Sequence, residues 1–385
     1  MGGSRQDKQL SEDRAGDYRN NASIWSTVSN REQAMVRNVH PNPYDNLGED
    51  DWWHPQDLSA NQVPSILSAS QVDQFRHDGF VVVTGLWPVD LIMQAAVEAR
   101  ELHPFDDVVD ARGGFSEMPW VHKREDAPDV ALNHMTIHSR ALAAVSQLME
   151  RPVLDLRLSQ SHVIAKYGHQ ISRPGEERDG TIAGDQDIHV DYGNNTLMVP
   201  PHRTRAEAVA CLCYYSDVDE AGGATHFAKA QPGELTTYEP KRFNPPNFVI
   251  GTENGSAGAT TGPRSPEKTE RRYREERPVR YEPGSCILYR LNAWHRGTPA
   301  ALGKVRYTHH HVWRYRAAEW VNWQSLAPRM SQMPTRYLSV LSVEQRTVLG
   351  FAAPGDPYWS EETLDSVGQR YPEMDMTPYR EAIAG

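Results

Sequence analysis

Hydrophobic and polar positions indicate a helical beginning to the ordered part of the chain. Ser70 is placed to cap a helix that ends at Gly79, and the β-branched run 80–83 predicts a strand directly after it. Apolar residues recur at helical spacing over 89–102, and the same spacing returns over 137–149. We therefore expect one strand among three helices in this part.

From residue 153 onward the pattern changes to short strand-forming runs separated by turn residues. The runs are VLDLRLSQSHVIAKYG, DIHVDYGNNTLMVP, EAVACLCYYSDVD, GATHFAK, PVRYEPGSCILYRLN and KVRYTHHHVWRYR. No helix of useful length separates them, which excludes parallel βαβ units and favours an antiparallel sandwich or barrel. We predict an all-β core, a jelly roll, with N-terminal and C-terminal helices added to it.

The pattern divides the chain into three parts. Residues 1–66 are polar and turn-rich and predict an extended arm, residues 67–316 form the domain, and residues 317–385 predict a helical annex packed on it. Within the domain, 231–278 is poor in large apolar residues and rich in Gly, Pro, Ser, Thr and charge. Insertions of this length are functional lids or disordered segments, and we expect a lid-like one. The annex has two N-cap candidates, Ser342 and Ser360.

The charge balance and the cysteine content exclude several classes of partner. Lys and Arg number 40 against 51 Asp and Glu, a net charge of -11, so no global positive field exists to hold nucleic acid. No stretch reaches the roughly 20 uninterrupted apolar residues that span a bilayer, and the polar N-terminus lacks the apolar run of a secretory signal. Cys211, Cys213 and Cys286 form no disulfide framework, so we expect a cytoplasmic protein with Cys211 and Cys213 in its core.

The candidate chemistry lies in the predicted strand that begins with His189 and Asp191. Residues i and i+2 of a strand point to the same face, so these side chains project together. His295, at the end of a later strand run, completes two histidines and one carboxylate, the facial set that leaves three positions of an octahedral Fe(II) open for oxygen chemistry. Chance alone gives about two H-x-D/E triplets in such a composition, so the context matters. Arg306, eleven residues after His295, presents a guanidinium whose fork matches a carboxylate.

Four segments resemble the phytanoyl-CoA dioxygenase family. QVDQFRHDGFVVVTGL is similar to its N-terminal helix and strand, DIHVDYGNN to its iron motif, SDVDEAGGATHF to its turn between core strands, and WHRGTPAALGKVR to its distal histidine and arginine. The resemblance covers 67–316 and implies a double-stranded β-helix of the cupin-like kind. It also implies Fe(II) held by His189, Asp191 and His295, with Arg306 binding the distal carboxylate of 2-oxoglutarate.

Two departures from the family concern the co-substrate and the substrate. The family often has a hydroxyl two residues after the distal histidine; this chain has Gly297 there, and the adjacent Thr298 is the candidate substitute. The family's G-S-H ending after the turn is absent, and the chain reads FAKAQPGE instead. We therefore expect co-substrate binding by Arg306 and Thr298, with substrate handling that differs from the family's.

The implied activity is hydroxylation of an unactivated C–H bond of a small molecule, with O2 consumed and 2-oxoglutarate converted to succinate and CO2. The carboxylate of Asp191 favours hydroxylation over halogenation, because related halogenases replace it with a small residue. One alternative is a cupin-like isomerase or hydrolase that uses a divalent metal as a Lewis acid and needs no Arg306. Another is a carbohydrate-binding sandwich in which the aromatic residues bind the ligand. Fatty acyl thioesters, amino-acid derivatives and natural-product intermediates remain open as substrates, and the oligomeric state is open too.

Further side chains near these strands have two interpretations each. Lys166 and Tyr167 precede the loop that leads to the H-x-D motif, and they contact the co-substrate or lie on the solvated surface. His162 on the same run has the same alternatives. Trp294 and Tyr289, close to the distal histidine in sequence, shield a metal from water or pack in the core.

Three other groups are expected to be structural. The run 309–311 is three histidines, of which alternation allows at most two to share a site, so we expect a structural or exposed role. An arginine-rich segment either recruits an anionic substrate or is a solvated, salt-bridged stretch; its members are Arg271, Arg272, Arg274, Arg277 and Arg280. Trp52 and Trp53 pin the arm to the domain or line a site.

Overall fold

The protein is represented by a computed structural model, and its description covers selected parts of the chain. The described residues are 44, 47–62, 65–104, 115–117, 130–168, 188, 190–191, 205–229, 266–301, 303–318, 321 and 335–384. Those from Gly48 onward belong to one compact unit. His189 and residues 231–265 of the predicted insertion lie outside the described residues.

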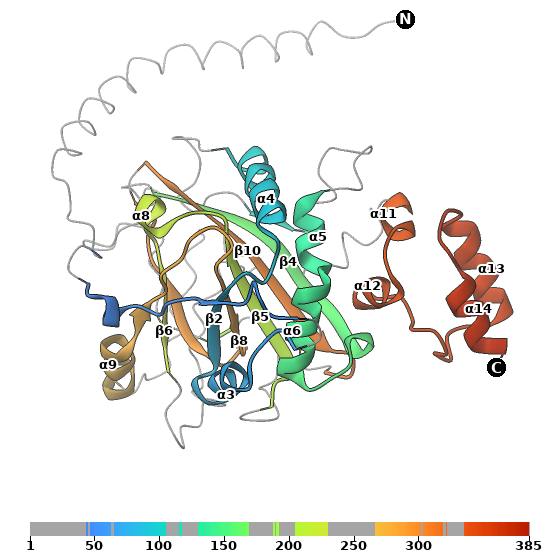
Figure 1. Cartoon of the computed structure of the whole chain (residues 1–385), viewed down its shortest axis with the longest axis horizontal. Helices are drawn as coiled ribbons and strands as arrows, with labels where there is room; N and C mark the ends of the chain where they lie inside the picture. The colour runs from blue at the N-terminus through green and yellow to red at the C-terminus, as the bar shows by residue number, and fades with distance from the viewer. Residues whose placement is uncertain are drawn as a thin grey trace, which may run out of the picture. The chain divides into compact units, whose positions relative to one another are not determined.

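The described strands form two β-sheets (Figure 1). The larger sheet has the order β1 (Gln56–Asp57), β2 (Phe80–Thr84), β8 (Cys286–Tyr289), β5 (Ala208–Tyr214), β10 (Val305–Tyr315), β4 (Leu156–Tyr167) and β3 (Phe115–Glu117). The smaller sheet has the order β7 (Arg277–Pro278), β6 (Thr225–Ala228) and β9 (Trp294–Gly297). Every pair in these sheets is antiparallel except β1 with β2, so the predicted antiparallel core is confirmed for the described strands.

Most of the described helices lie before β4 or after β10. Those before β4 alternate along the chain with β1, β2 and β3, and they are η1 (Glu49–Asp51), α3 (Ala69–Asp78), α4 (Val89–Leu102), α5 (Ala131–Ile137), α6 (Ser139–Met149) and η3 (Val153–Asp155). Between strands lie α8 (Val218–Ala221) and α9 (Pro266–Glu275), and after them α11 (Thr335–Ser339), α12 (Val343–Val348), α13 (Glu361–Arg370) and α14 (Thr377–Ala384). No helix among the described residues is long and apolar enough to cross a bilayer.

The predicted helix boundaries are largely confirmed. Helix α4 has the predicted bounds, and Ser342 and Ser360 cap α12 and α13 through their hydroxyls. The cap of α3 is a correction: it is Ser68 rather than Ser70, because the Ser68 hydroxyl accepts from the Gln71 N–H at 3.3 Å while the Gln71 side chain accepts from the Ser68 N–H at 2.8 Å. Gly79 ends the helix as predicted, with φ 91° in the left-handed region that favours glycine.

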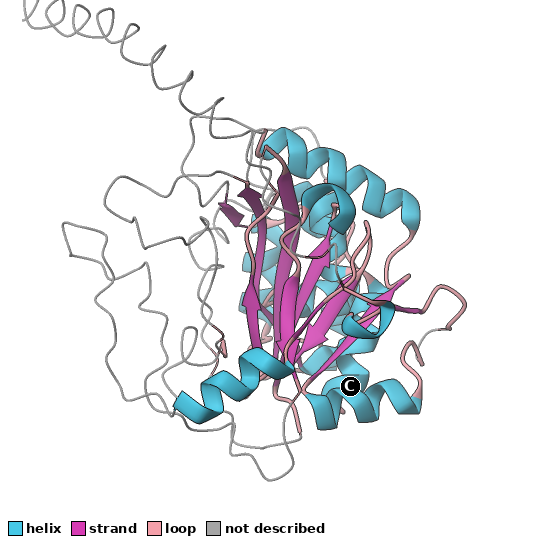
Figure 2. Ribbon diagram, turned by 90° about the vertical axis from the view of Figure 1, so that its left-hand side faces the viewer, coloured by secondary structure: helices cyan, strands magenta, loops and turns pink. Residues whose placement is uncertain are grey.

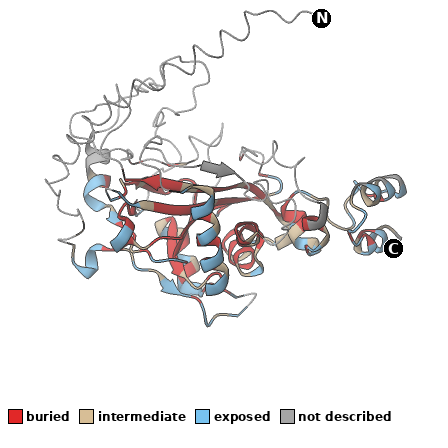
Figure 3. Cartoon of the chain, turned by 90° about the horizontal axis from the view of Figure 1, so that it is seen from above, coloured by how far each residue is buried: buried red, intermediate tan, exposed pale blue. Residues whose placement is uncertain are grey.

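The larger sheet separates two kinds of side chain onto its two faces. One face packs against α4, α5 and α6 and forms the main hydrophobic core (Figures 1 and 2). Its strand residues include Val81, Val83, Val163, Ala165, Val209, Cys211, Cys213, Cys286, Leu288 and Trp313. The two cysteines expected in the core are therefore there. Figure 3 shows these strands buried beside helices whose outward surfaces are exposed.

The opposite face of the larger sheet meets the smaller sheet through aromatic rings. The ring of Phe227 on β6 lies 4.7 Å from that of Phe80 on β2 and 5.4 Å from that of Tyr289 on β8. All three side chains are buried. This contact of aromatic rings joins the two sheets. The polar residues on this face of the larger sheet lie in the remaining space between the sheets.

Trp53 anchors the N-terminal arm to both sheets. Its N–H donates to the carbonyl of Pro278 and its carbonyl accepts from Arg280, each at 2.9 Å. The indole Nε1–H donates to the carbonyl of Phe227 at 3.1 Å, and the ring lies 5.2 Å from that of Phe80. The structural interpretation of this tryptophan is confirmed.

Arg140 on α6 should contribute strongly to stability, because its guanidinium donates to four backbone carbonyls. The acceptors are Asn61 and Leu58, both at 2.6 Å, Gly85 at 3.1 Å and Leu86 at 3.3 Å. We predict that Arg140→Met lowers the free energy of unfolding by about 2–3 kcal/mol, since several carbonyls lose a charged donor.

Urea denaturation measures this effect, and Arg76→Met is the matched control. Arg76 forms surface ion pairs with Asp73 and Glu150 and its side chain is 38% exposed, so its loss should cost about 0–1 kcal/mol. Equal losses in the two variants would contradict the role given to Arg140.

Candidate metal centre

Asp191 and His295 face each other in the space between the two sheets. The Asp191 N–H donates to the carbonyl of Leu291 at 2.8 Å, which holds this segment beside the turn between β8 and β9. Nε2 of His295 lies 3.6 Å from Oδ1 of Asp191, and the two side chains are 10% and 16% exposed. This separation is too long for a hydrogen bond. Ligand atoms about 2.1 Å from one ion in neighbouring positions lie about 3 Å apart, so the pair can share a metal ion.

The hydrogen bond of His295 favours a metal-binding tautomer. Its Nδ1 lies 3.0 Å from the carbonyl oxygen of Ala293. Because a carbonyl only accepts, Nδ1 is the donor in this bond, and Nε2 is the ring nitrogen that faces Asp191. The ring is stacked on Phe227 at 5.1 Å and lies 5.0 Å from Tyr289, which fixes its orientation. Two electron-pair donors held at this distance suit a cation between them.

Tyr289 orients the carboxylate of Asp191. Its hydroxyl donates to Oδ2 at 2.8 Å, while Oδ1 is the oxygen that faces His295. Burial and the nearby charge of Asp191 raise the pKa of Tyr289 well above its usual value, so the phenol remains a donor at neutral pH. Tyr289 packs in the core between the sheets, as one of its two interpretations expected, and its hydroxyl also bonds to Asp191, a contact for which the sequence contained no signal.

Two expectations about the ligand segments need correction. Val190 and Asp191 do not belong to a strand, so the argument that strand alternation aligns the H-x-D side chains has no basis here. His295 lies in a strand of its own, β9, rather than at the end of the preceding run. The reason is the turn closed by the Ala293 N–H donating to Arg290 at 2.8 Å, which carries the chain from the larger sheet to the smaller one.

The third predicted ligand, His189, lies outside the described residues. Within the part of the chain that the structure describes, no group of three His, Cys, Asp or Glu side chains is arranged to hold a metal ion. Of the predicted ligands, the structure describes Asp191 and His295.

The three predicted co-substrate residues gather at one corner of the same space. Arg306 on β10 lies directly opposite Lys166 on β4 in the strand register. Arg306 donates to the carbonyl of Gly223, Lys166 donates to the carbonyl of Thr298 at 2.9 Å, and the Thr298 hydroxyl donates to Ala224 at 2.6 Å. The surface interpretation of Lys166 is wrong, because its strand position turns the side chain inward and leaves it 9% exposed.

Arg306 is a buried cation that suits an incoming anion. The residue is 5% exposed, and Nε has no hydrogen-bond partner among the described residues. No described carboxylate lies within ion-pair distance of its guanidinium. Burying a charge without a counter-ion is costly, and a guanidinium fork binds a carboxylate in two places. The corner formed by Arg306, Lys166 and Thr298 therefore fits a carboxylate-bearing ligand.

Two neutral histidines line the interior between this corner and Asp191–His295. His162 on β4 and His310 on β10 are register partners, with rings stacked 5.2 Å apart. Burial lowers the pKa of His162 to about 3, although the charge of Asp191 opposes the shift. Burial also lowers the pKa of His310 well below its usual value, and the charge of Arg306 acts in the same direction. Both rings are uncharged at neutral pH, and the surface interpretation of His162 is wrong.

The other two histidines of the 309–311 run lie on the helix-covered face. His309 is hydrogen-bonded to Ser161 through Nε2 and to Tyr215 through Nδ1, both at 2.9 Å. His311 is fully buried and stacked on Trp313 with ring centroids 5.1 Å apart. The structural role expected for these two residues is confirmed.

The arginine-rich segment binds the protein's own residues. Arg272 is 2% exposed and its guanidinium lies 3.6 Å from the centroid of the Trp294 ring, so this tryptophan packs under an arginine. Arg280 donates to both carboxylate oxygens of Asp219, at 2.5 and 2.8 Å, and its guanidinium lies over the ring of Trp52. Arg277 donates to the carbonyl of Asp50 at 2.7 Å, and Arg271 forms an ion pair with Glu275 at 3.6 Å. These contacts support the salt-bridged interpretation of the segment over recruitment of an anionic substrate.

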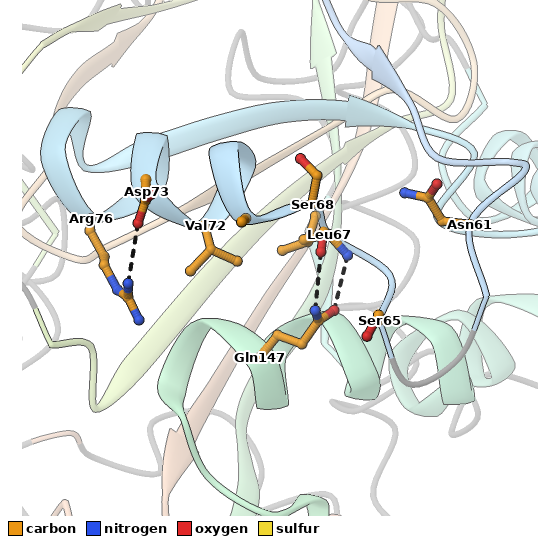
Figure 4. A pocket seen from close by; sticks show the side chains of 9 residues that line it. Asn61, Ser65, Leu67, Ser68, Val72, Asp73, Arg76 and Gln147 are labelled. Atoms are coloured by element: carbon orange, nitrogen blue, oxygen red, sulfur yellow. Dashed lines mark hydrogen bonds and ion pairs between the residues drawn. The ribbon is translucent and has the colours of Figure 1, made fainter.

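A separate cleft of about 570 Å³ lies beside α3 and α6 (Figure 4). Its lining residues are Asn61, Ser65, Leu67, Ser68, Ala69, Val72, Asp73, Arg76 and Gln147. The Gln147 amide bonds to the backbone of Ile66 and Leu67 at 2.7–3.1 Å, which holds the loop before α3. None of the candidate site residues lines this cleft.

Comparison with known proteins finds no matching family model and no matching curated protein. Solved structures with a similar trace are non-heme alpha-ketoglutarate dependent enzymes of nogalamycin biosynthesis and AviO1 from Streptomyces viridochromogenes Tue57. The epimerase SnoN, in complex with Fe3+, alpha ketoglutarate and nogalamycin RO, is 18% identical with a TM-score of 0.42, and the match covers 65% of this chain and 86% of that one. The carbocyclase SnoK is 12% identical with a TM-score of 0.43, covering 67% and 90%. AviO1 is 15% identical with a TM-score of 0.41, covering 66% and 97%. Likenesses this distant carry no inference about what this chain does.

His311 should make stability depend on pH. Burial lowers its pKa to about 3, whereas an unfolded histidine titrates near 6.5. Below pH 6.5 His311 is therefore protonated in the unfolded state but not in the folded state. The free energy of unfolding falls as the pH drops through this range. Between pH 7.5 and pH 5 this one group accounts for about 2 kcal/mol.

The variant His311→Phe tests this assignment, because phenylalanine keeps the ring and cannot titrate. Urea denaturation at both pH values should show about 2 kcal/mol less pH dependence than in the wild type. The variant should be near wild-type stability at pH 7.5, since neither ring nitrogen of His311 has a hydrogen-bond partner among the described residues. An unchanged pH dependence would contradict the prediction.

Proposed function

We propose that this chain is an Fe(II)- and 2-oxoglutarate-dependent dioxygenase that hydroxylates an unactivated C–H bond of a small molecule and releases succinate and CO2. The observation that carries the proposal is the buried Arg306, which has no described carboxylate partner and lies in the same interior as Asp191 and His295. A 2-oxo diacid has one end suited to a metal ion and another suited to a guanidinium. A cupin-like isomerase or hydrolase would need the metal ligands but no Arg306.

The donor set fits Fe(II). In the proposed site, His295 supplies Nε2, Asp191 supplies Oδ1 and His189 supplies the third ligand, which is the combination of two imidazoles and one carboxylate that leaves positions open for a chelating acid and O2. When bound, the iron would combine with 2-oxoglutarate and O2 to supply the oxidant for C–H cleavage. The protein's part is to hold the ligands, to bind the acid and to keep bulk water from the reacting atoms.

Each supporting residue has a separate task in this proposal. Tyr289 holds one carboxylate oxygen of Asp191 so that the other is presented to the metal. Arg306 and Lys166 bind the distal carboxylate of 2-oxoglutarate, with Thr298 completing that corner. The neutral rings of His162 and His310 separate the cationic corner from the metal ligands without adding charge.

The proposal extends to architecture and setting. We propose that residues 67–316 form a double-stranded β-helix with 231–278 as a lid, preceded by an arm over 1–66 and followed by an annex over 317–385. The two facing sheets support the β-helix, and the capped helices α12 and α13 support the helical annex. We place the protein in the cytoplasm, where its three cysteines would remain thiols.

Metal-dependent binding of 2-oxoglutarate tests the proposed function. Anaerobic addition of Fe(II) and 2-oxoglutarate should produce the weak visible charge-transfer band of the chelate, and air should then release labelled CO2 from the acid. Asp191→Ala should weaken metal binding at least about tenfold and abolish CO2 release, because a ligand is lost. Asp219→Ala is the control, since Asp219 pairs with Arg280 at the surface and should leave both readouts intact. Metal binding without any 2-oxoglutarate binding would instead favour the isomerase or hydrolase.

Tyr289→Phe should weaken metal binding without removing a ligand. The variant keeps the ring beside His295 and deletes the hydroxyl that orients Asp191, and partners of this kind change metal affinity about 10–100-fold. Calorimetric titration with Mn(II) measures the affinity. Tyr307→Phe is the matched control, because its hydroxyl donates to the carbonyl of His103 at 2.7 Å on the other face of the sheet. Equal Mn(II) affinities of the two variants would contradict the role of Tyr289.

A further inference from the structure

Helix α9 lies against the outer side of the smaller sheet, beside β6 (Figure 1). Neighbouring residues of a strand point to opposite faces, so Trp294 and Arg296 point away from the interior that His295 faces. Both of these flanking residues contact α9 or Glu276, the residue that follows it. The helix therefore holds β9 on either side of the candidate metal ligand.

The contacts between α9 and β9 are buried and well directed. The guanidinium of Arg272 stacks on the Trp294 ring at 3.6 Å. Glu276 accepts from Arg296 through both carboxylate oxygens, at 2.7–3.0 Å, and from His226 at 3.1 Å. Burial raises the pKa of Glu276, but the hydrogen bonds from His226 and Arg296 outweigh it and hold that pKa below its usual value. The carboxylate is therefore charged at neutral pH, and the bidentate pair persists.

The same helix also contacts the segment that carries Asp191. The hydroxyl of Tyr273 accepts from the backbone N–H of Ile188 at 3.1 Å, three residues before Asp191 in sequence. The guanidinium of Arg296 lies 5.6 Å from the centroid of the Tyr273 ring. One side of α9 thus connects the two chain segments from which the candidate ligands come.

Two described hydrogen bonds hold the segment of Ile188 and Asp191. Ile188, Val190 and Asp191 lie outside the described strands. The backbone bonds described for these residues are the one from Ile188 to Tyr273 and the one from Asp191 to Leu291. The first ties the segment to α9, and the second ties it to the turn before β9.

We propose that α9 is a brace that sets the spacing of the two ligand segments, with Tyr273 as its positioning residue. This inference rests on the proposed metal site and deepens it, because α9 and Glu276 belong to the predicted insertion 231–278. The insertion then has a task in assembling the metal centre. Any change in the docking of α9 is transmitted to the affinity for the metal.

Tyr273→Phe is the direct test, because it keeps the ring beside Arg296 and removes the acceptor for Ile188. Loss of one such hydrogen bond corresponds to about a three- to tenfold weaker Mn(II) affinity by calorimetry. Hydrogen exchange followed by mass spectrometry should show faster exchange of the Ile188 amide. Urea denaturation should give nearly wild-type stability, since Tyr273 is 37% exposed. Tyr358→Phe, at a tyrosine that is 52% exposed, is the matched control and should change neither affinity nor exchange.

The possible outcomes separate this inference from the proposed function. Mn(II) affinity and Ile188 exchange equal to the wild type in Tyr273→Phe would overturn the brace and leave the oxygenase proposal standing. A wild-type chain that binds Mn(II) but no 2-oxoglutarate would overturn the oxygenase proposal. The brace would then still be tested by the ratio of the Mn(II) affinities of the wild type and Tyr273→Phe. A wild-type chain that binds no divalent metal would overturn both.

Discussion

Side chains along β10 alternate between two chemically different faces of the larger sheet, and this alternation organises both the core and the candidate site. Arg306 and His310 point to the interior between the sheets, while His309, His311 and Trp313 point into the helix-covered core. Strand β10 is paired on both sides, with β4 and β5, so its register is held twice. A slip of one residue would drive a guanidinium into the apolar core and turn an indole towards the polar interior. The burial of the apolar side chains of β10 therefore fixes the face of the sheet on which Arg306 lies.

This separation gives the two faces different electrostatics. On the helix side, buried imidazoles are neutral and pack as rings, as His311 does on Trp313. Between the sheets, a cationic corner at Arg306 and a carboxylate at Asp191 lie apart, with the neutral ring of His310 within electrostatic reach of both Arg306 and His295. A ligand that carries a carboxylate at one end and binds a metal at the other matches this order of charges.

The sequence pattern predicted those elements that are stabilised by interactions between residues close in sequence. Helix α4 has its predicted bounds because its apolar positions repeat over four turns, and Ser342 and Ser360 cap their helices because a hydroxyl at the N-cap needs only its own next turn. The prediction of Ser70 as a cap was wrong by two residues, since Ser68 has Gln71 three positions on and completes a capping box. The predicted strand at Asp191 was wrong because that segment bonds to a turn and a side chain instead of a strand.

Residue patterns were enough to predict the antiparallel character of the core and to select Asp191, His295 and Arg306 as candidates. Two contacts between distant residues had no sequence signal: Tyr289 bonds to Asp191, 98 residues away, and Tyr273 bonds to Ile188, 85 residues away. The fold also places His295 in the smaller sheet. The physical reason is that a four-residue strand such as β9 has too few positions for its pattern to specify a partner. Its place follows from the turn before it and from the helix packed on its outer side.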